Sequence, residues 1–178
     1  MKSMVDFARD ELKWTQPRAL KKEFELRSGS QVLGRLVFKN SFGSFATGTS
    51  VDGCWTFKRV GFWQTRVTIR RCDSEADIAT FMNNTWKGGG SLELPDGRRF
   101  RATSNLWQTK LEFQDTSENP MIELKTAGLV HLSATVEIQP AAHQMPELPW
   151  IVMLGWYLAI MMMSDSAGAT GAAGAAGG

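Results

Sequence analysis

The sequence predicts an all-β protein, a closed antiparallel barrel of about eleven to twelve strands wrapped around a buried hydrophobic C-terminal helix. Two observations lead to this prediction. Short segments in which apolar and polar residues alternate fill most of the chain, and each is long enough for one strand. After them, Leu148 to Met163 carries no charge and is apolar on every side, so lipid or protein must enclose it.

The alternating segments follow one another as in a β-meander. In Val130 to Ile138, every second residue is apolar, which is typical of a strand with one buried face. Turn residues such as Pro95-Asp96-Gly97 stand where hairpins must reverse. The predicted strands are Lys22–Ser28, Gly34–Lys39, Phe42–Thr49, Cys54–Arg59, Thr65–Arg71, Ile78–Asn83, Ser91–Leu94, Arg98–Thr103, Lys110–Gln114, Met121–Lys125 and Val130–Ile138.

Part of the meander is repeated. Asp52-Gly53, followed by Phe62 to Ile69, returns 44 residues later as Asp96-Gly97 followed by Leu106 to Phe113. Each copy contains a turn, a strand, a loop with a Trp and a second strand. The repeat indicates either a duplicated unit or two hairpins of the same type, and in both cases the copies should occupy comparable places in the sheet.

The C-terminal apolar segment is expected to be a helix over about residues 147–163. At ~1.5 Å per residue, Leu148 to Met163 reaches ~24 Å, against a hydrocarbon thickness of ~30 Å. Strands with one apolar face need a common partner, and a barrel of this size encloses room for one helix. We therefore expect burial inside the barrel. The alternative is a membrane anchor with Trp150 and Trp156 at the two interfaces.

Composition and termini suggest one soluble domain. The 178 residues have a formal net charge of +2, which is too balanced to indicate a nucleic acid partner. Residues 1–24 contain no apolar run typical of a secretory signal, so a cytoplasmic location is predicted, with Cys54 and Cys72 reduced and buried. The expected organisation is an N-terminal extension over 1–20, the barrel over 21–165, and a disordered Gly/Ala tail over 166–178.

The order of elements and a set of scattered residues resemble the Tubby C-terminal-like superfamily, with its phospholipid scramblase and LURP-one-related branches. These residues are Gly34 to Phe38, Asp52 to Lys58, Asp96 to Arg98, Leu132 to Ile138, and Leu154 to Leu158 with the following Asp165. The resemblance implies a barrel of about twelve strands around a central helix. It also implies association with anionic lipid at a membrane surface.

One segment departs from the scramblase pattern. Scramblases are similar in having an acidic calcium-ligand stretch near the terminal helix, whereas Gln139 to Gln144 contains no carboxylate here. A calcium-triggered scramblase is therefore not expected. The resemblance does not place the head-group ligands of Tubby-type domains on individual residues of this chain.

No motif indicates catalysis. A P-loop, a dinucleotide-binding glycine motif, and zinc-protease and serine-hydrolase motifs are all missing from the sequence. His131 and His143 have no carboxylates placed near them for a metal site, and Gly88 to Gly90 is better interpreted as a hairpin linker than as a phosphate cradle. We predict a non-enzymatic protein without cofactor or metal.

One basic surface is a candidate for ligand binding. If the apolar residues of their strands face inward, five cations face outward, and they belong to the two repeated units. They are Arg66, Arg70, Arg99, Arg101 and Lys58. This set predicts a site for an anionic lipid head group, with Trp63 or Trp107 as a wedge into the membrane interface. The alternative is an ordinary solvated wall with Glu93 and Glu112 as neighbours, and tryptophans that plug the barrel ends or pack between the wall and the helix.

The predicted function is a non-enzymatic binding module on anionic lipid, located in the cytoplasm and peripheral at the membrane. Two alternatives stay open. One is a membrane protein anchored by Leu148 to Met163, and the other is a cytosolic domain of unknown function, such as an enzyme with a site at the rim of the barrel that no motif reveals. The sequence indicates no protein partner.

Overall fold

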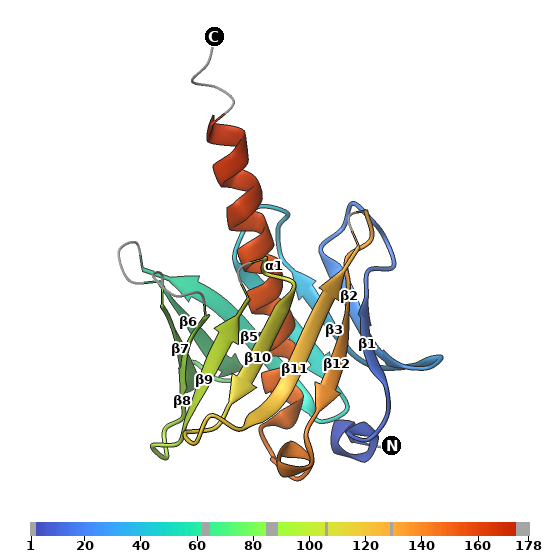
Figure 1. Cartoon of the computed structure of the whole chain (residues 1–178), viewed down its shortest axis with the longest axis vertical. Coiled ribbons are helices and arrows are strands. Elements are labelled where there is room, and N and C mark those ends of the chain that lie inside the picture. Colours follow the sequence, from blue (N-terminus) through green and yellow to red (C-terminus); the bar gives the residue numbers. More distant parts are fainter. Residues whose placement is uncertain (1–2, 62–64, 85–88, 106, 129, 174–178) are drawn as a thin grey trace.

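Twelve strands form one closed antiparallel barrel around a C-terminal helix (Figure 1). This computed structural model describes residues 3–61, 65–84, 89–105, 107–128 and 130–173. Each strand pairs with its neighbours in the chain, and β1 pairs with β12 to close the barrel. The predicted fold class is therefore confirmed.

All eleven predicted strands are present, with ends that differ by a few residues. Strand β12 starts only at Ser133, and Val130 is exposed rather than part of a buried face. The elements are η1 Met4–Phe7, β1 Leu12–Thr15, β2 Glu23–Ser28, β3 Gln31–Phe38, β4 Phe45–Ser50, β5 Gly53–Val60, β6 Arg66–Arg71, β7 Asp77–Asn83, β8 Gly89–Glu93, β9 Arg99–Ser104, β10 Lys110–Gln114, β11 Pro120–Ala127, β12 Ser133–Ile138, η2 Pro140–Ala142 and α1 Leu148–Ala173.

The first twenty residues belong to the barrel, so the predicted N-terminal extension over 1–20 is wrong. Strand β1 lies between β12 and β2, and the side chains of Leu12 and Trp14 are completely buried. Before it, η1 buries Met4 and Phe7 in the core. A strand of four residues gives too short an alternation to be recognised in the sequence, but without it the barrel would have two free edges.

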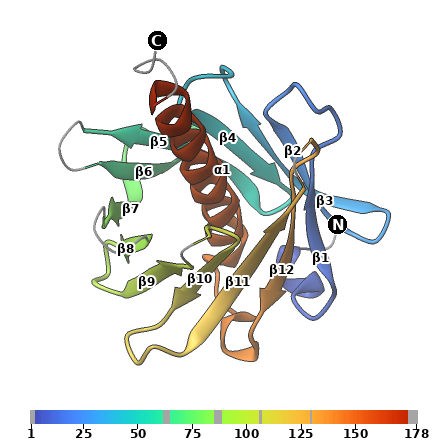
Figure 2. The same ribbon diagram turned by 45° about the horizontal axis from the view of Figure 1, so that its top comes forward.

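Helix α1 fills the barrel, as predicted. From Leu148 to Met161 it is buried on every side, because strands surround it (Figure 2). Its large aromatic side chains are enclosed by aromatic rings of the wall. Trp156 stacks on Trp14 with ring centroids 6.1 Å apart, and Tyr157 stacks on Phe38 at 5.5 Å. The Tyr157 hydroxyl donates a hydrogen bond of 2.6 Å to the Ser44 carbonyl oxygen.

The helix continues beyond the predicted end. Residues 166–178 were expected to be disordered, but α1 runs to Ala173, and its last part projects from the barrel (Figure 1). This segment contains no proline and is rich in alanine, the best helix former, so it can extend a helix that the barrel already nucleates. The last five residues, 174–178, lie outside the described part of the chain.

Cys54 and Cys72 form a disulfide, so the prediction of two reduced, buried thiols is wrong. The pairing of β5 with β6 places them opposite each other, with Cα atoms 5.4 Å apart, and Cys72 is exposed. This separation suits a disulfide, whereas the spacing along the chain gives no hint of it. Disulfides persist mainly in oxidising compartments. The cytoplasmic location stays a prediction.

The two repeated units do occupy comparable places in the sheet. One is the hairpin of β5 and β6, and the other is the hairpin of β9 and β10, each preceded by its Asp-Gly turn. Two strands, β7 and β8, separate the units.

Candidate functional site

The five predicted cations do not form one cluster. Lys58 lies on β5 and Arg66 and Arg70 on β6, whereas Arg99 and Arg101 lie on β9. All five belong to the outer wall, but β7 and β8 stand between the two groups. At ~4.8 Å between neighbouring strands, the groups are ~14 Å apart across the sheet.

Three of these cations are paired with acids of the same wall. Arg70 binds Asp77 at 2.6 Å, Arg99 binds Glu93 at 3.1 Å, and Arg101 binds Glu118 at 2.9 Å. Arg70 also binds Glu75 at 3.0 Å, and the hydrogen bond with Asp77 raises the pKa of Arg70 above its ordinary value. Among the described residues, Lys58 and Arg66 have no ion pair. The expected alternative, a solvated wall with acidic neighbours, therefore describes most of this surface.

A different surface emerges from the loops. In an antiparallel meander, successive connections alternate between the two ends of the barrel. We call the end from which α1 projects the exit end, and the end at which α1 begins the base (Figure 1). The described residues of the six exit-end loops are 16–22, 39–44, 61 and 65, 84, 105 and 107–109, and 128 and 130–132.

The exit end carries the most exposed apolar side chains of the described residues. Leu20, Phe42, Trp107 and Val130 are exposed to 95%, 102%, 80% and 72%, and each belongs to a different exit-end loop. The large apolar side chain most exposed in a turn at the base is Val51, at 40%. Large apolar groups held in water at one end of a molecule typically mark a surface for a membrane or a partner.

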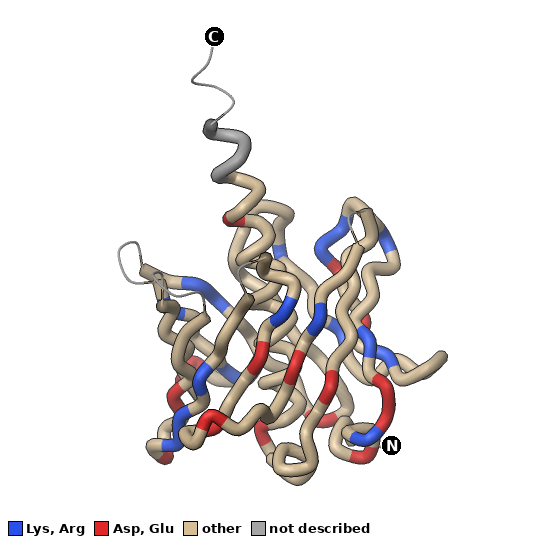
Figure 3. Tube along the Cα trace, viewed as in Figure 1, with Lys and Arg blue, Asp and Glu red and all other residues tan. Residues whose placement is uncertain are grey.

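Charge divides along the same axis. None of the six exit-end loops contains an Asp or Glu. Their cations among the described residues are Arg18, Lys21, Lys22 and Lys39. By contrast, acids occur in the turns at the base, such as Asp52, Asp73, Asp96, Asp115 and Glu118. Figure 3 shows that Asp and Glu are concentrated toward the base, whereas Lys and Arg occur toward both ends.

Several exit-end cations are available to a ligand. Lys21 and Lys39 are exposed, as is Arg66 at the start of β6, and within the described part of the chain they have no ion pair. Lys22 is half-buried, with its ammonium 5.5 Å from the centre of the Phe38 ring and 3.2 Å from the Ser164 hydroxyl. Burial lowers the pKa of Lys22, and the nearby Asp165 opposes that shift.

The projecting part of α1 is fastened to the exit end where it leaves the barrel. Arg59 of β5 binds the Asp165 carboxylate at 2.6 Å, and the Ser166 hydroxyl donates to the Gln108 side chain at 2.8 Å. These contacts join the helix to strand β5 and to the loop between β9 and β10. They hold the helix where it leaves the barrel, and its uncharged continuation from Ser166 onward extends past the loop tips (Figure 1).

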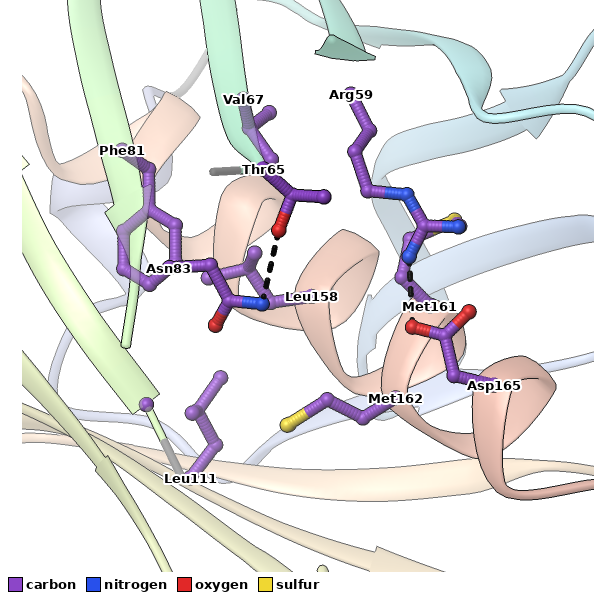
Figure 4. Close-up of a pocket in the computed structure, with 11 residues that line it drawn as sticks. Arg59, Thr65, Val67, Phe81, Asn83, Leu111, Leu158, Met161, Met162 and Asp165 are labelled. Atoms are coloured by element: carbon purple, nitrogen blue, oxygen red, sulfur yellow. Dashed lines mark hydrogen bonds and ion pairs between the residues drawn. The ribbon is translucent and has the colours of Figure 1, made fainter. Parts of the chain in front are cut away.

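A small cavity of about 40 Å³ lies at the exit end, between α1 and the wall (Figure 4). Its inner surface is apolar, and its mouth is polar. The apolar lining consists of Val67, Phe81, Leu111, Leu158, Met161 and Met162. At the mouth, the Asn83 amide donates to the Thr65 hydroxyl at 3.2 Å, beside the ion pair of Arg59 with Asp165.

Other predicted features have structural explanations or cannot be assessed. A ring nitrogen of His131 lies 3.1 Å from the Gln16 carbonyl oxygen, and one of His143 lies 3.1 Å from that of Ile138. No group of three His, Cys, Asp or Glu that suits a metal ion occurs among the residues that the structure describes. Trp63 and Gly88 lie outside the described residues. Trp107 is exposed in a loop at the exit end, and its role as a wedge stays a prediction.

Comparison with models of protein families, with curated proteins and with solved structures gives no match. The resemblance to the Tubby C-terminal-like superfamily therefore stays a prediction, and the argument about function depends on the geometry of this molecule.

The prediction of the binding surface considered only which strand face each cation occupies. It therefore pointed to the outer wall and did not identify the loops of the exit end. The signal was present in the sequence, because alternate connections of a meander lie at the same end. Loops with Leu20, Phe42 and Trp107 alternate with turns that contain Asp52 and Asp96. Sorting the predicted turns by this alternation would have separated the two ends.

Proposed function

We propose that this protein is a non-enzymatic module that binds the surface of anionic membranes through its exit end. The observation that carries the proposal is the coincidence, at one end, of exposed apolar loop tips with cations and without loop carboxylates. An interface of anionic lipids offers both complements, because it has apolar chains beneath a negatively charged layer.

The two components have different physical roles. Phe42 and Trp107 are large enough to gain ~1.5–3 kcal/mol each if they become fully buried in the apolar layer. Lys21 and Lys39 add ~1 kcal/mol each near an anionic surface. The free energy gained from the apolar side chains alone, or from the cations alone, is small compared with the free-energy cost of association. Reversible binding therefore requires both kinds of side chain.

The predicted cations contribute unequally to this proposal. Arg66 opens β6 at the exit end, and Lys58 lies two residues before the end of β5 on the same side. Both extend the basic surface from the loops onto the wall. Arg70 and Arg99 lie toward the base and would have to exchange a carboxylate partner for a lipid phosphate, which gives little net gain.

The alternative of a helical membrane anchor retains one supporting observation. Leu148–Gly168 is long and apolar enough to cross a membrane by length and composition. However, most of that stretch, Leu148 to Met161, is buried inside the barrel. Moving it into lipid would expose the inner faces of the strands, at ~25 cal/mol per Å² of apolar surface. We therefore propose binding by the intact barrel.

Vesicle flotation tests the proposal. The full chain is mixed with vesicles of phosphatidylcholine alone or of phosphatidylcholine with phosphatidylglycerol, at low and high salt. We expect recovery with the anionic vesicles, weakened by salt, because charges attract across a screened interface. Equal recovery with neutral and anionic vesicles would contradict the electrostatic part of the proposal, and no recovery with either would contradict all of it.

A further inference from the structure

The cavity beside α1 has the size and lining of a site for an apolar group. By this measure of volume a water molecule needs ~10–15 Å³, so about 40 Å³ holds more than one atom group. Water is retained in a cavity when it finds two to four polar partners, and cavities lined by apolar side chains take apolar guests instead. The side chains of Val67, Leu111 and Leu158 offer no such partners.

The position of the cavity limits what can enter it. It lies at the exit end, where Asp165 and Thr65 are found and from which the proposed membrane contact is made. Anything that enters from a docked membrane must pass the polar mouth. There, Arg59 uses Nη1 to bind Asp165, and its side chain is still 30% exposed. A guanidinium has five N–H donors, so it can bind a second anion as well.

We infer that this cavity binds a few methylene groups of an acyl chain of an anionic membrane phospholipid, next to the lipid phosphate on Arg59. The inference rests on the proposed function for the source of the lipid. Met161 and Met162 suit this role, because unbranched thioether side chains adapt to a guest at low cost. The volume fits only a few methylene groups, so the remainder of the lipid would stay in the membrane.

The test uses a lipid that is soluble as a monomer. Lysophosphatidylglycerol with a ten-carbon chain is titrated, below its micelle concentration, into full-length protein carrying ¹³C-methyl methionine, and the methyl signals of Met161 and Met162 are followed by NMR. We expect saturable shifts of these two signals. Decanoate should produce weaker shifts of the same signals, and inorganic phosphate, which has a charge but no chain, should produce none.

Three variants separate the cavity from the rest of the core. Val67→Phe fills the cavity and should weaken binding by ~10-fold or more, because the chain loses its burial. Leu111→Ala enlarges the cavity and should strengthen binding several-fold. Leu124→Ala is the matched control, since Leu124 is equally buried but contacts the helix at Gly155, away from the cavity, and it should leave binding unchanged.

Several outcomes would overturn the inference. These are the absence of shifts at Met161 and Met162, equal binding by the filled and enlarged variants, or equal effects of inorganic phosphate and decanoate. Binding of decanoate without binding of the lysolipid would assign the cavity to a free fatty acid and overturn the membrane source. Thermal melting of each variant shows whether it folds. If Val67→Phe does not fold, the tighter binding expected for Leu111→Ala still tests the inference.

The proposed function is tested separately, by flotation with anionic vesicles. If vesicles recover the protein but no lysolipid shift appears, only the acyl-chain site is wrong. If the lysolipid binds in the cavity but vesicles do not recover the protein, only the membrane-surface function is wrong.

Discussion

The two ends of this barrel are built from the same strands but differ in their chemistry. At the base, η1 and η2 cover the opening, a disulfide joins β5 to β6, and Arg98 bridges Asp96 and Glu147. At the exit end, exposed apolar side chains stand among cations, and the central helix projects outward. One end is closed by contacts within the chain, while the other presents groups that gain stability only by contact with something else.

This difference shows which parts of the chain determine the fold and which parts carry the proposed function. The strands and the inner half of α1 supply the core, which would be the same whatever the loops contained. Loops run over the surface, so their side chains can serve binding without disturbing the core. A barrel with loops of opposite chemistry at its two ends therefore has a defined orientation toward a surface.

The largest effect should follow from breaking the shared core, because both ends exist only while the helix fills the barrel. Leu154 is fully buried, so Leu154→Asp places an unpaired charge inside and should cost several kcal/mol of unfolding free energy. Chemical denaturation measures this. The matched control is Gly168→Asp, outside the barrel, which should change stability by less than ~0.5 kcal/mol. Equal stability of the two variants would mean that the helix is not core.

Removing the apolar tips should have the next largest effect and should be confined to one end. Phe42→Ser with Trp107→Ser loses ~3 kcal/mol of insertion, which is ~100-fold in affinity for anionic vesicles. The control at the other end is Val51→Ser with Val32→Ser, which should bind like the natural sequence. Vesicle flotation compares both. A larger loss of vesicle affinity in the variant at the base would mean that the base, and not the exit end, binds the membrane.

Removing cations should give a smaller effect that depends on salt. Lys21→Ala with Lys39→Ala should weaken binding by ~2 kcal/mol, or ~30-fold, at low ionic strength, and by less at high ionic strength. Arg70→Ala with Arg99→Ala is the comparison on the wall, where both cations lie toward the base and are paired with acids. We expect less than ~2-fold from it. Equal losses would restore the wall as the binding surface.

The smallest effect concerns pH and the packing of the helix near the exit end. Burial raises the pKa of Tyr157 to about 12 from its ordinary 10.0. The unfolded chain therefore ionises first, and stability present below about pH 10 is lost as the pH rises toward about 12. By about pH 11 the loss due to this group is ~1 kcal/mol. Chemical denaturation of the natural chain and of Tyr157→Phe, each below about pH 10 and at about pH 11, measures this loss of stability. An equal loss of stability in the two proteins would exclude ionisation of Tyr157 as its cause.

Most of the fold could be predicted from the sequence, because period-two alternation and turn residues are local signals. The apolar segment after Glu147 indicated the central helix for a similar reason, since nothing on its surface can face water. Two elements were missed. Strand β1 is stabilised mainly by its position between β12 and β2, and the bond between Cys54 and Cys72 depends on the register of two strands. Both require knowledge of the tertiary structure.

The candidate site could be predicted only in part. The outward direction of Arg66 and Arg99 follows from alternation, but their acidic partners follow from pairing between strands, and those partners change the interpretation. The exit end was within reach, because the order of loops in a meander determines the end at which each lies. The cavity was not, since its lining comes from several strands and from the helix, whose rotation inside the barrel the sequence does not determine.

The most direct test of the central claim is the environment of a fluorophore placed at each end. An environment-sensitive dye attached through a single added cysteine at residue 42, with the natural disulfide kept intact, is compared with the same dye at residue 51 on addition of anionic vesicles. The account predicts a blue-shifted, brighter emission at residue 42 and no change at residue 51. A shift at residue 51 alone, or no shift at either position, would contradict it.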